Sequence, residues 1–213
     1  MTDPLITRLR PAQRPTTTGH LIVLLHGLGS DENDLLGLAD YLPETAHVAT
    51  LRAPLPYGAQ GYRWFDLSFP GGRIVYAHEE ALASMELIHD RVQSLQEELD
   101  CPPASTVLGG FSQGAVMSFA ALAKYPTLAR SGLLMSGALL PDIVSETSDA
   151  LRGVQFLVQH GSFDPVLPII FGRTLRDYLL EESIPHMYKE YPMQHEISRE
   201  SLGDLSAWLA QVF

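Results

Sequence analysis

The sequence predicts an α/β protein with a mainly parallel central sheet. Short aliphatic runs alternate with helix-length segments through most of the 213 residues, an order that is typical of parallel strands joined by helices. The first run, residues 21–25, is continuously aliphatic, as in a strand buried on both faces. The chain contains no repeat, low-complexity tract or linker, and its length suits one core, so we expect a single domain over residues 1–213.

The segment after this first strand predicts a helix and a second strand. Residues 31–42 fit a helix that has Ser30 or Asp31 as its N-cap and Pro43 as its stop. Residues 46–51 then form an apolar run of strand length. The chain therefore starts its strand–helix alternation close to its N-terminus.

The middle of the chain is predicted as an irregular loop followed by a long helix. Residues 53–76 are broken by Gly and Pro and rich in aromatic side chains, which favours a loop. Residues 78–99 carry an apolar side chain every three or four positions, which indicates one buried helix face. Further strands are expected at 106–108, 131–135, 155–159 and 187–191, with helices at 115–123, 167–180 and 198–212.

A serine stands where one predicted strand turns into a helix. The pentapeptide 110–114 has the pattern G-x-S-x-G, with Ser112 at its centre. A serine on such a turn is held in a tight conformation that exposes its hydroxyl, and the flanking glycines allow strand and helix to approach each other. The motif in this context predicts that Ser112 is the nucleophile of a serine hydrolase.

A serine hydroxyl needs a base, and the base is usually a histidine oriented by a carboxylate. In α/β-hydrolases the acid and then the histidine follow the serine along the chain. Asp164 and His195 each lie in a loop directly after a predicted strand, where sites on parallel sheets occur. Asp142 is the second choice for the acid. His160, four residues before Asp164, is expected to have a structural role within its own loop.

The reaction also needs backbone N–H donors placed for the negative oxygen of the tetrahedral intermediate. The N–H of Gln113 follows the nucleophile and begins a helix, whose N-terminal dipole favours negative charge. The second donor usually comes from the loop after an early strand. Here that loop is the glycine turn at residues 26–30, which predicts the N–H of Leu28 as the donor.

Substrate contacts are predicted from apolar residues near these groups. The aromatic loop could line an acyl groove or pack onto the protein body, and Trp64 is the first choice for a substrate contact. Leu167 and Met193 flank Asp164 and His195 and are expected to touch the acyl chain. The loop residues considered are Tyr62, Trp64, Phe65, Leu67 and Phe69.

Composition limits the partners and the location. A formal charge of −11 argues against nucleic acid and against docking to anionic lipid. The N-terminus lacks a signal pattern, and no apolar run approaches the roughly 18 residues that span a bilayer, so we expect no stable membrane insertion. The lone Cys101, which we interpret as an incidental loop thiol, cannot form an intramolecular disulfide. These features favour a cytoplasmic protein, and its chemistry requires no metal or cofactor.

The motifs resemble those of the carboxylesterase/acyl-protein thioesterase family, also called the phospholipase/carboxylesterase family. The resemblance runs from about residue 19 to the C-terminus and departs at Ser30, where many members carry Asp. It rests on His26-Gly27-Leu28-Gly29, Arg63-Trp64-Phe65-Asp66, Gly110-Phe111-Ser112-Gln113-Gly114, Met135-Ser136-Gly137, His160-Gly161 with Asp164, and His195-Glu196-Ile197.

This resemblance implies an α/β-hydrolase fold with helices on both faces of the sheet and no large cap domain. It also implies a Ser112–His195–Asp164 triad and an oxyanion hole from the N–H groups of Leu28 and Gln113. The expected function is a serine carboxylesterase that cleaves small-molecule or acyl-ester substrates through an acyl-enzyme. The alternatives are an acyl-protein thioesterase or lysophospholipase, and a catalytically silent binding module, which would usually lack a triad member. The resemblance and the apolar loop also favour a homodimer.

Overall fold

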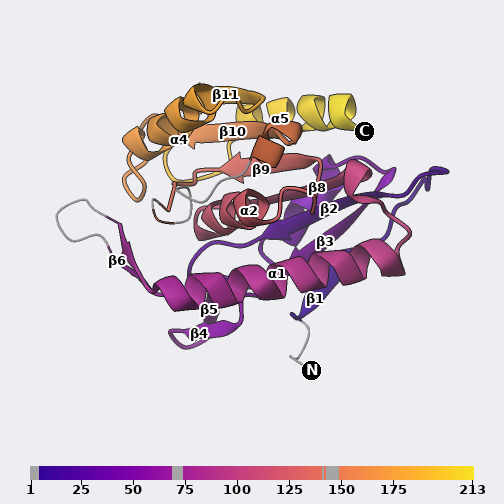
Figure 1. The fold of residues 1–213 in the computed structure, drawn as a ribbon, viewed down its shortest axis with the longest axis horizontal. Coiled ribbons are helices and arrows are strands. Elements are labelled where there is room, and N and C mark those ends of the chain that lie inside the picture. The colour runs from indigo at the N-terminus through magenta and orange to yellow at the C-terminus, as the bar shows by residue number, and fades with distance from the viewer. Residues whose placement is uncertain (1–4, 69–73, 141, 143–148) are drawn as a thin grey trace.

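The computed structural model describes residues 5–68, 74–140, 142 and 149–213, and a seven-stranded sheet dominates it (Figure 1). The strand order is β1-β3-β2-β8-β9-β10-β11. Within the described residues, β1 pairs antiparallel with β3, and the other pairs of this sheet are parallel, as predicted. The strands are β1 Thr7–Arg10, β2 His20–Leu25, β3 Ala46–Leu51, β8 Thr106–Phe111, β9 Ser131–Met135, β10 Gln155–Gly161 and β11 His186–Tyr191.

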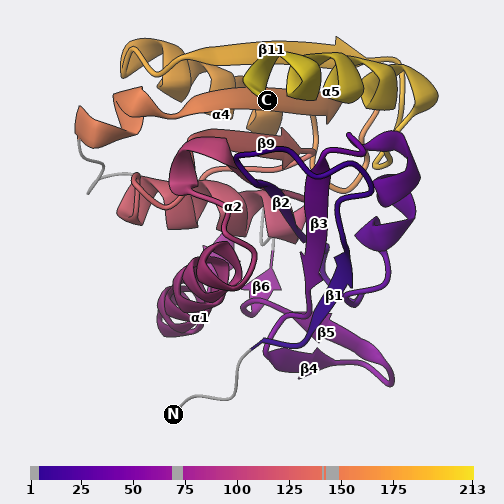
Figure 2. The same cartoon turned by 90° about the vertical axis from the view of Figure 1, so that its right-hand side faces the viewer.

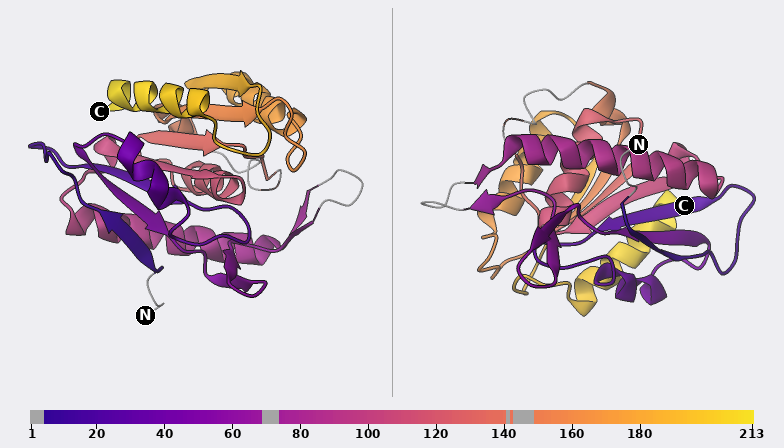
Figure 3. Two further views of the ribbon diagram at one scale, coloured as in Figure 1. Left: turned by 180° about the vertical axis from the view of Figure 1, so that it is seen from behind. Right: turned by 90° about the horizontal axis from the view of Figure 1, so that it is seen from below.

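Helices cover both faces of the sheet (Figure 2). Successive side chains of a strand point to opposite faces, so Leu21 and Val23 pack in the core under α1, α2 and α4, while Ile22 packs under η1 and α5. The view from behind shows η1 and α5 together on the second face (Figure 3). The helices are the 3₁₀ helices η1 Leu35–Tyr41, η3 Pro103–Ser105 and η4 Asp149–Gly153, and the α-helices α1 His78–Glu98, α2 Gln113–Lys124, α4 Ile170–Glu181 and α5 Arg199–Val212.

Two segments differ from their predictions. The predicted helix at 31–42 contains only the 3₁₀ helix η1, which starts at Leu35 with Asp34 as its N-cap. Ser30 is no helix cap, because its backbone forms a β-bridge with Tyr62. Pairing with a segment that is distant in sequence has overridden the local helix signal here.

The predicted irregular loop at 53–76 contains two short hairpins. Strands β4 Leu55–Tyr57 and β5 Gly61–Arg63 pair antiparallel, as do β6 Leu67–Ser68 and β7 Val75–Tyr76. These strands have two or three residues each, which is too short for a periodic pattern to show. Phe69 lies outside the described residues.

The edge strand β1 was not predicted from the sequence. Its residues are exposed or half-buried, so it lacks the continuous aliphatic run of the central strands. In the described part of the chain, no helix combines the length and apolar character that crossing a membrane requires.

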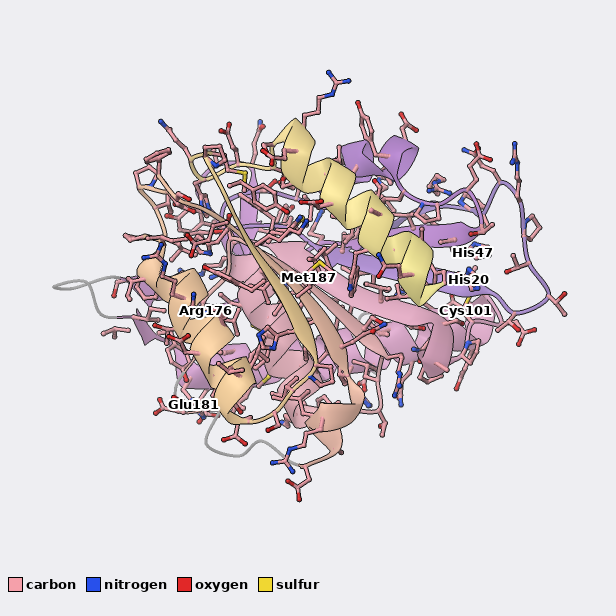
Figure 4. All side chains as sticks on the ribbon, turned by 90° about the horizontal axis from the view of Figure 1, so that it is seen from above. His20, His47, Cys101, Arg176, Glu181 and Met187 are labelled. Atoms are coloured by element: carbon pink, nitrogen blue, oxygen red, sulfur yellow. The ribbon has the colours of Figure 1, made fainter. Side chains whose placement is uncertain are left out.

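Cys101 lies in the loop after α1, but its thiol is packed inside the protein and only 1% of the residue is exposed. Burial, and then the Asp100 carboxylate, raise the pKa of this thiol. Figure 4 labels Cys101, His20 and His47 at one edge of the molecule, and a Cβ on Gly19, the residue before β2, would lie 2.6 Å from Cys101 Sγ. His20 and His47 lie at the amino ends of β2 and β3. This is the end of the sheet opposite to the carboxyl ends of the strands.

Candidate active site

Ser112 occupies a strained turn between β8 and α2. Its φ of 54° and ψ of −120° place the backbone in a region that L-residues rarely adopt. The surroundings hold this conformation, because the Ser112 N–H donates to the Met135 carbonyl at 2.9 Å and the Ser112 carbonyl accepts from Val116 at 3.1 Å. The turn raises the Ser112 hydroxyl above the carboxyl end of β8.

The two glycines of the pentapeptide are required by close backbone contact. A Cβ on Gly114 would lie 1.9 Å from the Leu25 carbonyl oxygen, and one on Gly110 would lie 2.5 Å from the same atom. Any side chain at either position would push β2 away from the turn. The predicted role of these glycines, close approach of strand and helix, is confirmed.

Three side chains that lie far apart in the sequence meet at this turn. His195 Nε2 lies 2.9 Å from Ser112 Oγ, and His195 Nδ1 lies 2.6 Å from Asp164 Oδ2. An ionised carboxylate can only accept hydrogen bonds, so we assign the imidazole proton to Nδ1. Nε2 is then free to accept the Ser112 hydroxyl proton.

The loop around Asp164 fixes this carboxylate. Asp164 Oδ1 accepts the N–H groups of Val166 and Leu167, each at 2.8 Å, and the residue is 5% exposed. Buried His160 holds the same loop, with its Nε2 2.7 Å from the Leu167 carbonyl oxygen. Burial is the largest effect on the pKa of His160 and lowers it, which favours a neutral ring. The predicted structural role of His160 is therefore confirmed.

Two other predicted residues, Met193 and Asp142, are not among the described residues that line the cleft beside Ser112 and His195. Met193 is 5% exposed, and its carbonyl accepts the Phe163 N–H at 3.1 Å, which ties the Asp164 loop to the His195 loop. Asp142, the second choice for the acid, accepts a hydrogen bond from the Tyr76 hydroxyl at 3.4 Å. Met193 therefore serves as a loop anchor in this structure.

The two predicted oxyanion donors flank Ser112. Gln113 is the first residue of α2, so its N–H has no acceptor within the helix. Leu28 lies in the loop after β2 and lines the same cleft as Ser112. A Cβ on Gly27 would lie 3.3 Å from Ser112 Cβ, which shows how closely this loop approaches the nucleophile turn.

The Gln113 side chain has a role that sequence reasoning missed. Its Oε1 accepts the Trp64 N–H at 2.9 Å, and its Nε2 donates to the Phe65 carbonyl at 2.8 Å. These bonds fasten the aromatic loop to the start of α2. The sequence carries no signal for them, because they depend on two segments that meet only in the folded chain.

Trp64 is not placed at the cleft, which corrects its prediction as a substrate contact. The side chain is fully buried, and its Nε1–H donates to the His26 carbonyl at 3.0 Å. A large ring with a single N–H donor is stable in a core when that donor finds a partner. The alternative that the aromatic loop packs onto the protein body therefore holds for Trp64.

An apolar cleft of about 190 Å³ opens beside Ser112 and His195. It includes Phe65 and Leu67, which agrees for these two residues with the alternative that the aromatic loop lines a groove, and Leu167, which the sequence analysis expects to touch the acyl chain. Tyr62 is elsewhere, with its ring 4.5 Å from the Arg52 guanidinium carbon. The lining residues that the sequence did not indicate are Ile74, Val116, Ala138, Leu140 and Val166.

Comparisons with protein families, curated relatives and solved structures all match this chain to esterases and thioesterases. A model of the phospholipase/carboxylesterase family matches residues 10–213. Acyl-protein thioesterase 1 of Kluyveromyces lactis is 26% identical over 97% of both chains, and a probable carboxylesterase of Oryza sativa is 26% identical over 96% of this chain and 83% of its own. Esterase PE8 has a TM-score of 0.86 at 26% identity, covering 99% of this chain and 100% of its own. A carboxylesterase from Mesorhizobium loti has a TM-score of 0.83 at 22% identity, covering 99% and 97%.

Proposed function

Because the chain belongs to the phospholipase/carboxylesterase family and is a serine hydrolase with the α/β-hydrolase fold, we propose that it hydrolyses carboxylic esters through an acyl-enzyme on Ser112. One observation carries this proposal. An unbroken hydrogen-bonded chain runs from Ser112 through His195 to Asp164 beside an apolar cleft.

In this reaction His195 Nε2 accepts the proton of Ser112 as Oγ attacks the ester carbonyl carbon. Asp164 stabilises the imidazolium that forms and holds the ring in the required tautomer. The negative oxygen is received by the N–H groups of Leu28 and Gln113. The imidazolium then protonates the leaving alcohol. A water molecule deprotonated by His195 releases the acid and restores Ser112.

The cleft beside Ser112 supports an apolar acyl group as the part of the substrate that is recognised. Its lining is aliphatic and aromatic apart from Ser112, Gln113 and His195. An acyl chain that leaves water for such a surface gains about 0.8 kcal/mol for each buried CH₂ group. The substrate class we propose is therefore a small carboxylic ester with an apolar acyl chain.

A second candidate function is the hydrolysis of acyl thioesters, which the relatives named acyl-protein thioesterase 1 favour. The same nucleophile, base and N–H donors serve both reactions, because both proceed through a tetrahedral oxyanion. Values of kcat/KM for an oxyester and a thioester with the same acyl chain separate the two. Measuring kcat/KM for a lysophospholipid with the same acyl chain tests the remaining alternative, lysophospholipase activity.

Labelling with a fluorophosphonate, followed by peptide mass spectrometry, tests the nucleophile. We expect modification of Ser112 and a loss of turnover of roughly 10⁴-fold or more in Ser112→Ala, with the fold retained. Ser94→Ala is a matched control, since Ser94 lies on α1 and donates only to the Asp90 carbonyl. Modification of another residue, or full turnover by Ser112→Ala, would refute the proposal.

A further inference from the structure

The N–H of Leu28 belongs to the peptide group that joins Gly27 to Leu28, and the His26 side chain contacts that same group. His26 Nδ1 lies 2.7 Å from the Gly27 carbonyl oxygen. A trans peptide group is planar, with its carbonyl and its N–H on opposite sides. Fixing the direction of the Gly27 carbonyl therefore fixes the direction in which the Leu28 N–H points.

The position of the proton on His26 follows from its second partner. The Ala53 N–H donates to His26 Nε2 at 3.0 Å. A backbone N–H can only donate, so Nε2 carries no proton and the proton of the neutral ring lies on Nδ1. The Nδ1–H then donates to the Gly27 carbonyl. Both ring nitrogens are thus used in a way that sets one orientation of the imidazole.

Burial keeps this ring neutral. His26 is 1% exposed, and burial is the largest effect on its pKa and lowers it. The bond to Gly27 and the carboxylates of Asp34, Asp31 and Glu32 act in the opposite direction and are smaller effects. A protonated ring would also set an Nε2–H donor against the Ala53 N–H. The neutral tautomer is the one that satisfies every neighbouring group.

Trp64 connects His26 to the other N–H donor. The Trp64 ring packs against the His26 ring with centroids 5.6 Å apart, and its Nε1–H donates to the His26 carbonyl. The Trp64 backbone N–H donates to the Gln113 side chain. The contacts of His26 and of the Gln113 side chain therefore meet at one buried residue, Trp64, through its indole and its backbone N–H respectively.

We propose that His26 is a positioning residue for ester hydrolysis, which aims the Leu28 N–H at the reacting carbonyl oxygen by holding the Gly27–Leu28 peptide group. This inference rests on the proposed function. His26 acts through the backbone, and it neither touches the substrate nor transfers a proton in the reaction.

Two variants separate the two hydrogen bonds of the ring. His26→Asn can keep a donor near the Nδ1 position but loses the acceptor for Ala53. His26→Gln can keep an acceptor near the Nε2 position but loses the donor to Gly27. Loss of a well-aimed oxyanion donor costs about 10²–10³ in kcat, so a misaimed one in His26→Gln is expected to cost about 10–100-fold, with KM nearly unchanged. His26→Asn is expected to retain most of the wild-type kcat.

A purely structural role for His26 predicts the opposite order. The bond from the Ala53 N–H to His26 Nε2, which joins the segment after β3 to the loop after β2, would then matter most. His26→Asn, which loses this bond, would then be the weaker enzyme. Either that order or a wild-type kcat in His26→Gln would overturn the inference. Binding of a trifluoromethyl ketone, which forms an oxyanion adduct on a serine, should weaken in parallel with kcat/KM in His26→Gln.

Wild-type protein provides a test that does not depend on the folding of a variant. Nitrogen-15 spectra of the histidine side chains should show His26 with a protonated Nδ1 and a bare Nε2. A proton on Nε2 would overturn the inference directly. Failure of the proposed function would look different, because wild-type protein would then lack fluorophosphonate labelling at Ser112 whatever the His26 variants do.

Discussion

The catalytic side chains and the proposed oxyanion donors are built by different means. On one side, Ser112, Asp164 and His195 present side chains, and each follows the carboxyl end of a strand in the parallel sheet. On the other side, the proposed oxyanion donors are the backbone N–H groups of Leu28 and Gln113. The side chains that hold the backbone around these N–H groups belong to His26, Trp64 and Gln113.

This difference explains why the triad residues could be predicted from their residue types, whereas the side chains that hold the N–H donors could not. A side chain that takes part in catalysis must be of a particular residue type, and the sequence gives that type directly. A backbone N–H is present in almost every residue, so only its orientation distinguishes it. Orientation is set by surrounding contacts: the His26 ring bonds the neighbouring Gly27 carbonyl, and the ring is itself held by the Ala53 N–H, which is distant in the sequence.

Asp164→Asn should have the largest effect on the triad side. The amide oxygen can still accept from Val166 and Leu167, which turns the NH₂ group toward His195 Nδ1. The imidazole proton then moves to Nε2, and the base is lost. We expect kcat to fall by about 10⁴-fold with little change in melting temperature. Asp142→Asn is the control, and a greater loss of kcat in that variant would contradict our choice of acid.

Gln113→Glu should have the largest effect of the supporting residues on the oxyanion side. The backbone N–H stays, but a buried carboxylate replaces the amide that donates to the Phe65 carbonyl, and its negative charge, one residue from Ser112, opposes the developing oxyanion. We expect kcat to fall by roughly 10–100-fold and the free energy of unfolding by about 2–3 kcal/mol, from kinetics and urea titration.

Gln96→Glu is a matched control for this variant. Gln96 is also buried, and its Nε2 donates to the Leu128 carbonyl at 2.8 Å, on α1 and away from the cleft. This control should lose stability but retain kcat. Equal kcat values for Gln113→Glu and Gln96→Glu would mean that the Gln113 side chain contributes to stability and not to catalysis.

Trp64→Phe should have a smaller effect, because most of the ring packing remains. The variant loses the Nε1–H donor and leaves the His26 carbonyl without this partner. We expect about 1–2 kcal/mol of lost stability and a decrease in kcat of roughly threefold to tenfold. Trp208→Phe, buried under the opposite face of the sheet, should lose stability only. Equal losses of kcat in both variants would mean that Trp64 has no specific role in holding the oxyanion donors.

The smallest expected effects on kcat come from two ion pairs whose residues do not line the cleft, Glu32 with Arg52 and Glu190 with Arg173. Hydrogen bonding from Arg52 lowers the pKa of fully buried Glu32, and Arg173 lowers the pKa of Glu190 to about 2. Lowered carboxylate pKa values stabilise the fold above the unfolded value of 4.5, and this stabilisation is lost as the pH falls through the folded pKa.

Urea titrations over a range of pH test these pairs. Glu32→Gln should cost about 2 kcal/mol near neutral pH, because Arg52 is left without its bidentate partner. Glu190→Gln should cost less than about 1 kcal/mol, because Arg173 is well exposed. Both differences from wild type should shrink below pH 4.5, for Glu190 by about pH 2. A difference that grows on acidification would contradict the assigned pairing.

The sequence predicted the buried framework well and the surface-facing segments poorly. The strand at 46–51 and the helix beginning at residue 78 agree with β3 and α1, because burial imposes an apolar pattern on them. The edge strand β1 and the hairpins β4–β5 and β6–β7 carry no such pattern. Their backbones are ordered by partners that are distant in the sequence.

The sequence by itself determined the parallel α/β class, the serine turn at Ser112 and the choice of Asp164 and His195 for one cluster. Residue type, spacing and position after a strand are enough for these, because local chemistry and strand order constrain them. The tertiary structure decided that Trp64 is a buried support and that the Gln113 side chain fastens the aromatic loop. It also brought the Ala53 N–H to His26 Nε2 and the Trp64 indole to the His26 carbonyl, because such bonds join segments whose proximity exists only in the folded chain.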